Sequence, residues 1–212
     1  MKSKRVIFPC GDLRLEGELQ LPEGNGPFPV VAVCHPHPLY GGDMDNNVVT
    51  AVYFALVKSS IATLRFNFRG VGNSGGRYGE CVGEQDDLQA ALDFLSTLKE
   101  IDSSRIGLAG YSFGGMVAAY VAIKDNRVKQ LALISPALKE TGWIRLKKYT
   151  LPKLILIGEA DTSVPFRPFQ RFFGDAKQYR IIAGADHFWS GFEEQLSSKI
   201  THFFHDKNVR NL

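Results

Sequence analysis

A serine stands at the centre of a short motif that is typical of nucleophilic enzymes. Residues 110–114 read Gly-Tyr-Ser-Phe-Gly, a match to Gly-x-Ser-x-Gly, and they follow the apolar run Ile106 to Ala109. Between a strand and a helix, this motif makes a sharp turn that exposes the Ser112 hydroxyl and aims the Phe113 N–H at the group under attack. The plainer interpretation is a glycine-rich helix start in which Ser112 is only an N-cap. The residues that follow the other predicted strands distinguish the nucleophile from the N-cap.

An acid and a histidine follow Ser112 in the chain order that a serine hydrolase of this topology needs. Asp161 follows the apolar run Leu154 to Ile157, and His187 follows the next predicted strand, near residues 178–182. In this chemistry neutral His187 takes the serine proton during attack, and ionised Asp161 fixes the imidazole tautomer. The plainer interpretations are an Asx-turn residue for Asp161 and a loop histidine for His187.

Two other acids, Glu159 and Asp186, compete with Asp161 for the orienting role. Asp186 is adjacent to His187 in sequence, which makes a side-chain bond between the two awkward. Glu159 lies closer to its strand than the acid loop normally places its carboxylate. We therefore predict that Ser112, Asp161 and His187 form a catalytic triad.

A tetrahedral intermediate needs two N–H donors for its oxyanion, and Phe113 supplies one. The second should come from the loop after the apolar run Val30 to Cys34, which reads His-Pro-His-Pro-Leu-Tyr-Gly-Gly. Proline has no N–H, so His35, His37 and Leu39 are the available donors. His37 sits where hydrolases with a His-Gly-x loop place theirs, and we predict His37 and Phe113 as the oxyanion hole. No metal is predicted at the His-x-His pair, because no acidic or histidine partner follows at ligand spacing.

Strands and helices alternate along most of the chain, and they have to position these residues. Residues 13–21 alternate apolar and polar side chains, as in an antiparallel strand at a sheet edge. Short continuous apolar runs predict strands covered on both faces, namely Val30 to Cys34, Ile61 to Phe66, Ile106 to Ala109, Leu131 to Ile134 and Leu154 to Ile157. Helical periodicity recurs over residues 48–57, 88–98, 113–123 and 192–204. We predict a single α/β domain over residues 1–212, with a mostly parallel sheet, helices on both faces and ligands bound at the carboxyl ends of the strands.

A glycine-rich segment after the run Ile61 to Phe66 has to be distinguished from a nucleotide site. Residues 70–75 read Gly-Val-Gly-Asn-Ser-Gly and fit the dinucleotide fingerprint Gly-x-Gly-x-x-Gly. That motif must open a helix at once, so that the helix N-terminus meets the pyrophosphate. Further glycines delay the predicted helix to about Glu84, so no nucleotide cofactor is predicted.

Composition and charge exclude several other classes of protein. The 25 Lys and Arg against 22 Asp and Glu give a net charge of +3, which is no reason to predict a nucleic-acid or membrane partner. No apolar stretch is long enough to span a bilayer, and the N-terminus lacks the apolar core of a signal peptide. Three cysteines at no metal spacing favour a reducing compartment. We expect a cytoplasmic protein.

Three segments together resemble the α/β-hydrolase family: the His-Pro-His-Pro loop at 35–38 with its two glycines, residues 64–75, and the serine motif at 110–114. They are most similar to small bacterial serine hydrolases related to dienelactone hydrolases and carboxylesterases. The resemblance covers almost the whole chain and implies an α/β-hydrolase fold with an eight-stranded sheet, an ester- or thioester-like scissile bond and no cofactor. Dienelactone hydrolases proper use a cysteine nucleophile, whereas this chain has Ser112, so their substrate is not carried over.

The connection that carries a helical cap in many α/β-hydrolases is short in this chain. Only residues 137–152 separate the run Leu131 to Ile134 from the next strand, too few for a cap domain. We therefore expect an open site with short loops, and we predict Tyr40, Trp143 and Trp189 as substrate-binding residues.

The same connection is basic. Between Ala137 and Lys153, five cations oppose Glu140 alone, which gives a local charge of +4. One interpretation is an ordinary solvated face. The other is a rim that attracts an anionic acyl substrate, such as a carboxylated ester or a phosphate-bearing thioester.

The sequence therefore predicts a serine hydrolase that cleaves carboxylic ester or thioester bonds of a small molecule through an acyl-enzyme. An acyltransferase or a peptidase would share the triad, and a non-catalytic module that binds a small ligand would share the fold. The complete set of predicted triad residues argues against the non-catalytic module.

Overall fold

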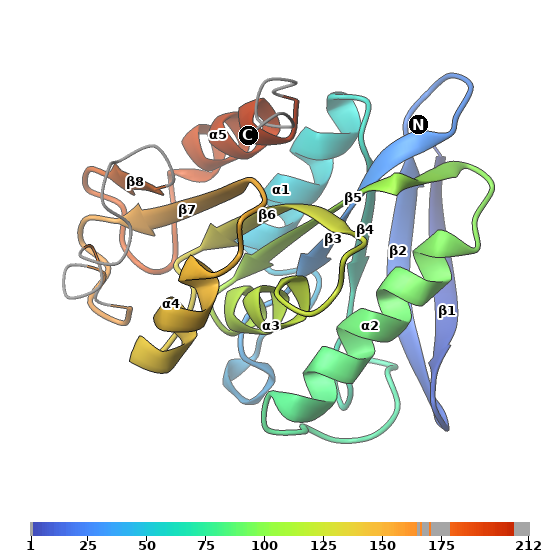
Figure 1. The fold of residues 1–212 in the computed structure, drawn as a ribbon, viewed down its shortest axis with the longest axis horizontal. Coiled ribbons are helices and arrows are strands. Elements are labelled where there is room, and N and C mark those ends of the chain that lie inside the picture. Colours follow the sequence, from blue (N-terminus) through green and yellow to red (C-terminus); the bar gives the residue numbers. More distant parts are fainter. Residues whose placement is uncertain (1, 165, 167–169, 171–178, 206–212) are drawn as a thin grey trace.

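One eight-stranded sheet organises the chain, which a computed structural model describes over residues 2–164, 166, 170 and 179–205 (Figure 1). Its strands are β1 (Lys2–Cys10), β2 (Leu13–Leu21), β3 (Phe28–Cys34), β4 (Ala62–Phe66), β5 (Ile101–Tyr111), β6 (Val128–Ile134), β7 (Lys153–Gly158) and β8 (Tyr179–Ile182). They lie in the order β1-β2-β4-β3-β5-β6-β7-β8. The pairs β1–β2 and β2–β4 are antiparallel and the other pairs are parallel. This confirms the predicted mostly parallel α/β sheet.

Helices cover both faces of the sheet (Figure 1). They are α1 (Asn47–Lys58), the short helix η1 (Pro38–Tyr40), α2 (Val82–Ser96), α3 (Phe113–Ala122), α4 (Glu140–Lys147) and α5 (Glu193–His205). Alternate residues of β3 enter two separate cores: Val30 and Ala32 pack with α2, α3 and α4, whereas Val31 and Val33 pack with α1 and α5. A strand that is buried on both faces has a continuous apolar run in its sequence, as β3 has here. Among the described residues, no helix is both long and apolar enough to cross a membrane.

Two elements differ from the sequence-based expectation. β1 lies outside β2 and forms the sheet edge that we expected β2 to form. Among the side chains of β1 that the structure describes, only Val6 and Phe8 are buried, so its apolar pattern is short and follows a basic, polar beginning. α4 lies within the segment expected to be a plain connection, because Gly142 and several charged residues mask its helical periodicity.

The beginning of α3 lies against the carboxyl end of β3. A Cβ on Gly114 would lie 2.4 Å from the carbonyl oxygens of both Cys34 and His35. Helix and strand can approach this closely only because the position has no side chain. The contact fixes the loop after β3 next to the turn between β5 and α3.

We expect Gly114→Ala to destabilise the protein, because its methyl group would overlap the Cys34 and His35 carbonyl oxygens. Overpacking of this kind costs about 1–3 kcal/mol, to be measured as a lower free energy of unfolding in urea. Gly75→Ala is the matched control, since the nearest atom to its added Cβ lies 3.7 Å away and its φ is not left-handed. Equal free energies of unfolding for the two variants would contradict the account.

Candidate active site

Ser112 lies in a strained turn between β5 and α3. Its φ of 53° and ψ of −115° form a conformation that residues with a side chain rarely adopt. Neighbouring backbone holds the turn: the Ser112 N–H donates to the Ile134 carbonyl and the Ser112 carbonyl accepts from the Ala137 N–H, both at 2.9 Å. Gly110 has no room for a side chain, because a Cβ there would lie 2.4 Å from the Gly114 oxygen. This is the strand-to-helix geometry that the serine motif requires.

The side chains of Ser112, His187 and Asp161 form one hydrogen-bonded chain. Ser112 Oγ lies 3.1 Å from His187 Nε2, and His187 Nδ1 lies 2.9 Å from Asp161 Oδ2. The three residues follow β5, β8 and β7, so their loops meet at the carboxyl edge of the sheet. A carboxylate that accepts a hydrogen bond from Nδ1–H keeps the imidazole proton on Nδ1, which leaves Nε2 free to accept the serine proton. The structure brings the three predicted residues together, and their catalytic role stays a prediction.

The surroundings of Asp161 keep its carboxylate ionised. Burial alone would raise the pKa of Asp161, but hydrogen bonds from His187, Ser135 and the Val164 N–H hold it below its ordinary value. Oδ1 accepts the N–H groups of Ser163 and Val164, both at 2.9 Å. Because both carboxylate oxygens have donors, this group can stabilise an imidazolium without taking its proton.

The two rival acids have other surroundings. Asp186 Oδ1 accepts the N–H groups of Phe188 at 2.9 Å and Trp189 at 3.1 Å, so this carboxylate caps its own turn. Glu159 has an exposed side chain. The geometry therefore agrees with the choice of Asp161 as the partner of His187.

Tyr111 and Trp189 hold the loop that carries His187. The Tyr111 hydroxyl donates to the His187 carbonyl at 2.7 Å, and the two rings lie 5.5 Å apart. Trp189 adopts a positive φ of 61° and donates from Nε1 to Ser135 Oγ at 3.1 Å. Since Ser135 also bonds to Asp161, Trp189 links the histidine loop to the acid loop.

The two predicted substrate-binding tryptophans are part of the protein interior. Trp143 and Trp189 are both 0% exposed, so neither offers surface to a substrate. Trp143 lies in α4 and packs against Phe166, with ring centroids 5.6 Å apart. The prediction that these side chains line the opening is wrong, because a large aromatic side chain near a strand end finds more apolar contact in the core than at the edge.

The loop after β3 brings His37 beside α3. Nδ1 of His37 accepts the Leu39 N–H at 3.2 Å, and its carbonyl accepts the N–H groups of Tyr40 and Gly42. The His37 ring lies 4.8 Å from the Phe113 ring. Phe113 is the first residue of α3, so its N–H has no partner within the helix. The ring contact places the loop beside the helix start, and the role of the two N–H groups as an oxyanion hole stays a prediction.

His35 is a buried residue with a structural role, which the sequence analysis did not predict. Its Nε2 accepts the Phe68 N–H at 3.0 Å, so its Nδ1 carries the proton and donates to the Pro36 carbonyl at 2.7 Å. Burial lowers the pKa of His35 to about 4, which keeps the ring neutral. His35 therefore joins the loop after β3 to the loop after β4. Nothing in the His-Pro-His pattern distinguishes this role from that of His37.

Exposed apolar side chains flank the reactive groups. Leu39 is 67% exposed, Tyr40 87% and Phe188 64%. The Tyr40 ring lies 4.8 Å from that of His37, and the Phe188 ring lies 5.8 Å from that of His187. Contact between Tyr40 and a substrate stays a prediction. Phe188 was not predicted, although its position directly after His187 was a usable signal.

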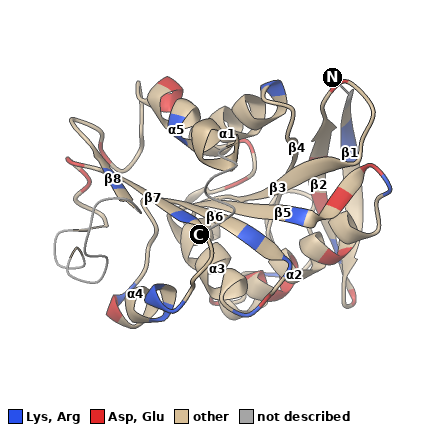
Figure 2. Cartoon of the chain, turned by 45° about the horizontal axis from the view of Figure 1, so that its top comes forward, with Lys and Arg blue, Asp and Glu red and all other residues tan. Residues whose placement is uncertain are grey.

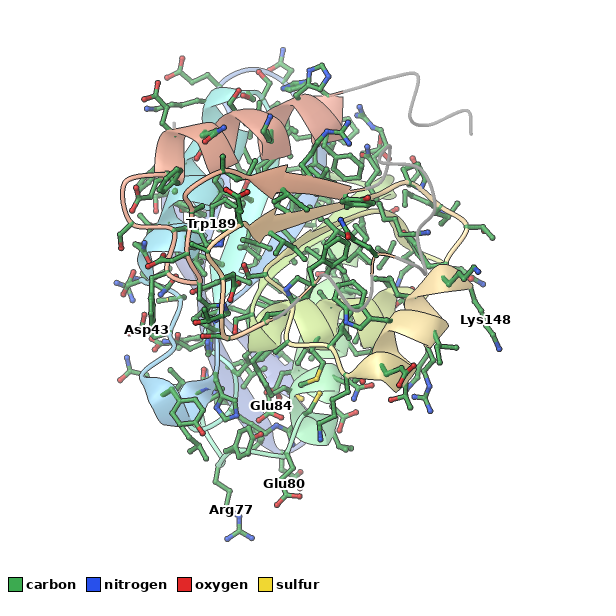
Figure 3. The ribbon with its side chains drawn as sticks, turned by 90° about the vertical axis from the view of Figure 1, so that its left-hand side faces the viewer. Asp43, Arg77, Glu80, Glu84, Lys148 and Trp189 are labelled. Atoms are coloured by element: carbon green, nitrogen blue, oxygen red, sulfur yellow. The ribbon has the colours of Figure 1, made fainter. Side chains whose placement is uncertain are left out.

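The basic connection leads away from the reactive residues. α4 returns the chain from the carboxyl end of β6 to the amino end of β7, so Lys147 and Lys148 lie toward the edge opposite Ser112. The coloured charges on α4 lie at the periphery in Figure 2, and Lys148 points outward in Figure 3. Lys153 is buried at the start of β7 and donates to the Tyr149 carbonyl. This placement favours the solvated-face interpretation over an anion-attracting rim.

The described residues show neither metal nor nucleotide geometry. In that part of the chain, no three His, Cys, Asp or Glu side chains gather as metal ligands. The glycine segment folds back on itself, with the Gly70 N–H donating to the Gly75 carbonyl at 3.1 Å. α2 begins only at Val82, so the segment does not open a helix as the nucleotide motif requires.

Comparison with known proteins identifies the family and supports the fold. Residues 81–190 match the dienelactone hydrolase family. A protein of Rickettsia prowazekii is 33% identical over 186 residues, which cover 82% of this chain and 78% of the relative. An α/β serine hydrolase homologue from Coxiella burnetii has a TM-score of 0.83 and 35% identity, over 100% of this chain and 98% of that one. A serine hydrolase without lid from Xanthomonas campestris has a TM-score of 0.79 and 29% identity, over 96% and 94% of the two chains.

The fold is that of α/β hydrolases, and its structural neighbours include a serine hydrolase without a lid. This confirms the expectation of a capless α/β-hydrolase fold. The chain belongs to the dienelactone hydrolase family, which makes it a hydrolase.

We expect the free energy of unfolding to fall in mild acid, because the His35 ring is neutral in the folded protein. Its pKa is about 4 in the folded protein and about 6.5 when unfolded. Between these values the unfolded chain binds a proton that the folded chain does not, so stability falls as the pH falls from about 6.5 to about 4. The loss from this group approaches about 3 kcal/mol at the acid end.

Urea unfolding at pH 7 and pH 5 measures the effect. The control is His35→Gln, whose side chain keeps a donor and an acceptor but does not titrate. The variant should lose less stability between the two pH values than the wild type does. The same loss in both proteins would show that His35 is not the group responsible.

Proposed function

We propose that this protein hydrolyses carboxylic ester or thioester bonds of a small molecule through an acyl-enzyme on Ser112. The hydrogen-bonded chain from Ser112 Oγ to His187 and on to Asp161, with distances of 3.1 and 2.9 Å, carries the proposal. Membership of a hydrolase family and a fold shared with serine hydrolases support it.

In the first half of the reaction, Ser112 Oγ attacks the carbonyl carbon while its proton passes to His187 Nε2. The N–H groups of His37 and Phe113 donate to the oxyanion that forms. When the intermediate collapses, the bond to the alcohol or thiol breaks and His187 returns the proton to that leaving group. Asp161 stabilises the imidazolium between these two transfers.

In the second half, water attacks the acyl carbon and gives its proton to His187. Collapse of this intermediate releases the carboxylic acid and restores the Ser112 hydroxyl. The similarity to the serine hydrolase without lid from Xanthomonas campestris supports an uncovered site, which water would reach directly. That arrangement favours hydrolysis over transfer of the acyl group to a second substrate.

The proposed compartment is the cytoplasm. Cys10, Cys34 and Cys81 are all free thiols, and Cys34 is buried as expected. A reducing compartment keeps exposed or partly exposed thiols in this state.

Ser112→Ala should abolish hydrolysis of short p-nitrophenyl esters, because the nucleophile is removed. We expect kcat to fall by at least about 10⁴-fold, measured as release of p-nitrophenol. Ser96→Ala is the control, since that hydroxyl lies in α2, where it donates to the Leu92 carbonyl and accepts from Arg127, and it should be dispensable. Turnover by Ser112→Ala at the wild-type rate would rule out the mechanism.

Asp161→Asn should lower kcat by about 10³–10⁴-fold with little change in KM. The amide cannot hold the imidazole in the tautomer that accepts the serine proton. Asp186→Asn is the matched control, because within the described part of the chain the Asp186 carboxylate accepts hydrogen bonds from its own turn. If Asp186→Asn were the more damaging change, the assignment of the acid would be wrong.

A further inference from the structure

The glycine-rich loop after β4 is fixed at its beginning by buried polar contacts. Ser74 Oγ donates to the Asn67 carbonyl at 2.7 Å and accepts the Glu16 N–H at 3.0 Å. The Glu16 carboxylate accepts from the Asn73 N–H at 2.7 Å and from its side-chain amide at 2.9 Å. A segment held this way is a rigid support, although it does not open a helix as a nucleotide site requires.

The end of the same loop is fixed by Glu84. This fully buried carboxylate accepts the Gly79 N–H at 2.7 Å and the Cys81 N–H at 2.8 Å. In Figure 3 Glu84 points into the protein, whereas Arg77 and Glu80 point outward. Between these outward side chains, the loop presents one half-buried aromatic residue, Tyr78, toward His37.

The Tyr78 hydroxyl lies 3.3 Å from His37 Nε2. His37 Nδ1 already accepts the Leu39 N–H, so the proton of the neutral ring is on Nε2 and is donated to the Tyr78 oxygen. Burial lowers the pKa of His37, which favours this neutral form. A tyrosine oxygen that accepts a hydrogen bond keeps its own proton available for another acceptor. Within the described residues, His37 is the hydrogen-bond partner of that hydroxyl.

Tyr78 and His187 contact different neighbours of the nucleophile. Its ring lies 5.0 Å from that of His37 and 5.9 Å from that of Phe113, the residue directly after Ser112. The ring of His187 contacts instead Tyr111, the residue directly before Ser112. In the proposed reaction His187 protonates the leaving group, so we expect the leaving group on its side, which leaves the side of Phe113 and Tyr78 for the acyl chain.

We propose that Tyr78 is a specificity-determining residue whose O–H donates a hydrogen bond to an oxygen atom in the acyl chain of the substrate. This inference rests on the proposed function. The preferred substrates are then esters or thioesters whose acyl chain carries an ether, hydroxyl or carbonyl oxygen close to the scissile carbonyl. Burial raises the pKa of Tyr78, so the donor keeps its proton at neutral pH.

Paired substrates test this directly. p-Nitrophenyl methoxyacetate and butyrate differ by one oxygen in place of a CH₂, as do the 3-methoxypropanoate and pentanoate esters. For each ester, kcat/KM of Tyr78→Phe is divided by that of the wild type, so the intrinsic reactivity of the ester cancels. The two ratios within a pair are then compared. We expect a loss of about 3- to 10-fold for at least one of the oxygen-containing esters, as for one hydrogen bond, and little loss for the partner ester.

Tyr120→Phe is the matched control. It removes a hydroxyl from another half-buried tyrosine, eight residues beyond Ser112 in α3 and about 12 Å along the helix axis. Both variants should unfold at the wild-type temperature, and the control should not change the ratio for any pair.

Each remaining outcome contradicts the inference. Equal losses of kcat/KM for both members of each pair would mean that Tyr78 has a structural role or a role at the scissile carbonyl. No loss of kcat/KM for any ester would mean that the Tyr78 hydroxyl has no role in hydrolysis. If the wild type hydrolyses esters and Ser112→Ala does not, these results overturn the role of Tyr78 alone. A wild type that hydrolyses none of the four esters would overturn the proposed function and this inference with it.

Discussion

The close approach of α3 to the ends of β3 and β5 is the constraint on which the rest of the site depends. Gly110 and Gly114 leave no room for a side chain, so the chain can turn from strand to helix within one residue. Ser112 occupies that residue at a positive φ, and backbone bonds to β6 and the residues after it offset the strain. The same contact places the first N–H of α3 beside the loop that carries His37. One packing constraint thus fixes both the turn that carries the serine and its position beside the His37 loop.

Hydrogen bonds from neighbouring loops then fix the protonation states around the serine. Donors on both oxygens keep Asp161 ionised, whereas burial keeps His35 neutral. His35 couples the loop after β3 to the loop after β4, and Tyr78 reaches back from the second loop to His37. Hydrogen bonds within the protein thus hold each of these polar groups in place.

Most of the fold could be predicted from local pattern. Continuous apolar runs identified the parallel strands, and helical periodicity identified α1, α2, α3 and α5. Burial on both faces of a strand, or along one side of a helix, determines directly which positions are apolar. β1 and α4 were missed, since polar residues and Gly142 obscure their patterns. The residues of the hydrogen-bonded chain could be predicted from their positions after strands, but the burial of Trp143 and Trp189 and the contact between Tyr78 and His37 depend on how distant segments pack. No local pattern carries that information.

The proposed chemistry depends on a Ser112 nucleophile that His187 activates. Labelling with a fluorophosphonate, followed by peptide mass mapping, measures this activation without knowledge of the substrate. We expect a single covalent adduct on Ser112 in the wild type and a much slower reaction in His187→Gln. An unlabelled Ser112, or labelling at the same rate in both proteins, would show that Ser112 is not such a nucleophile.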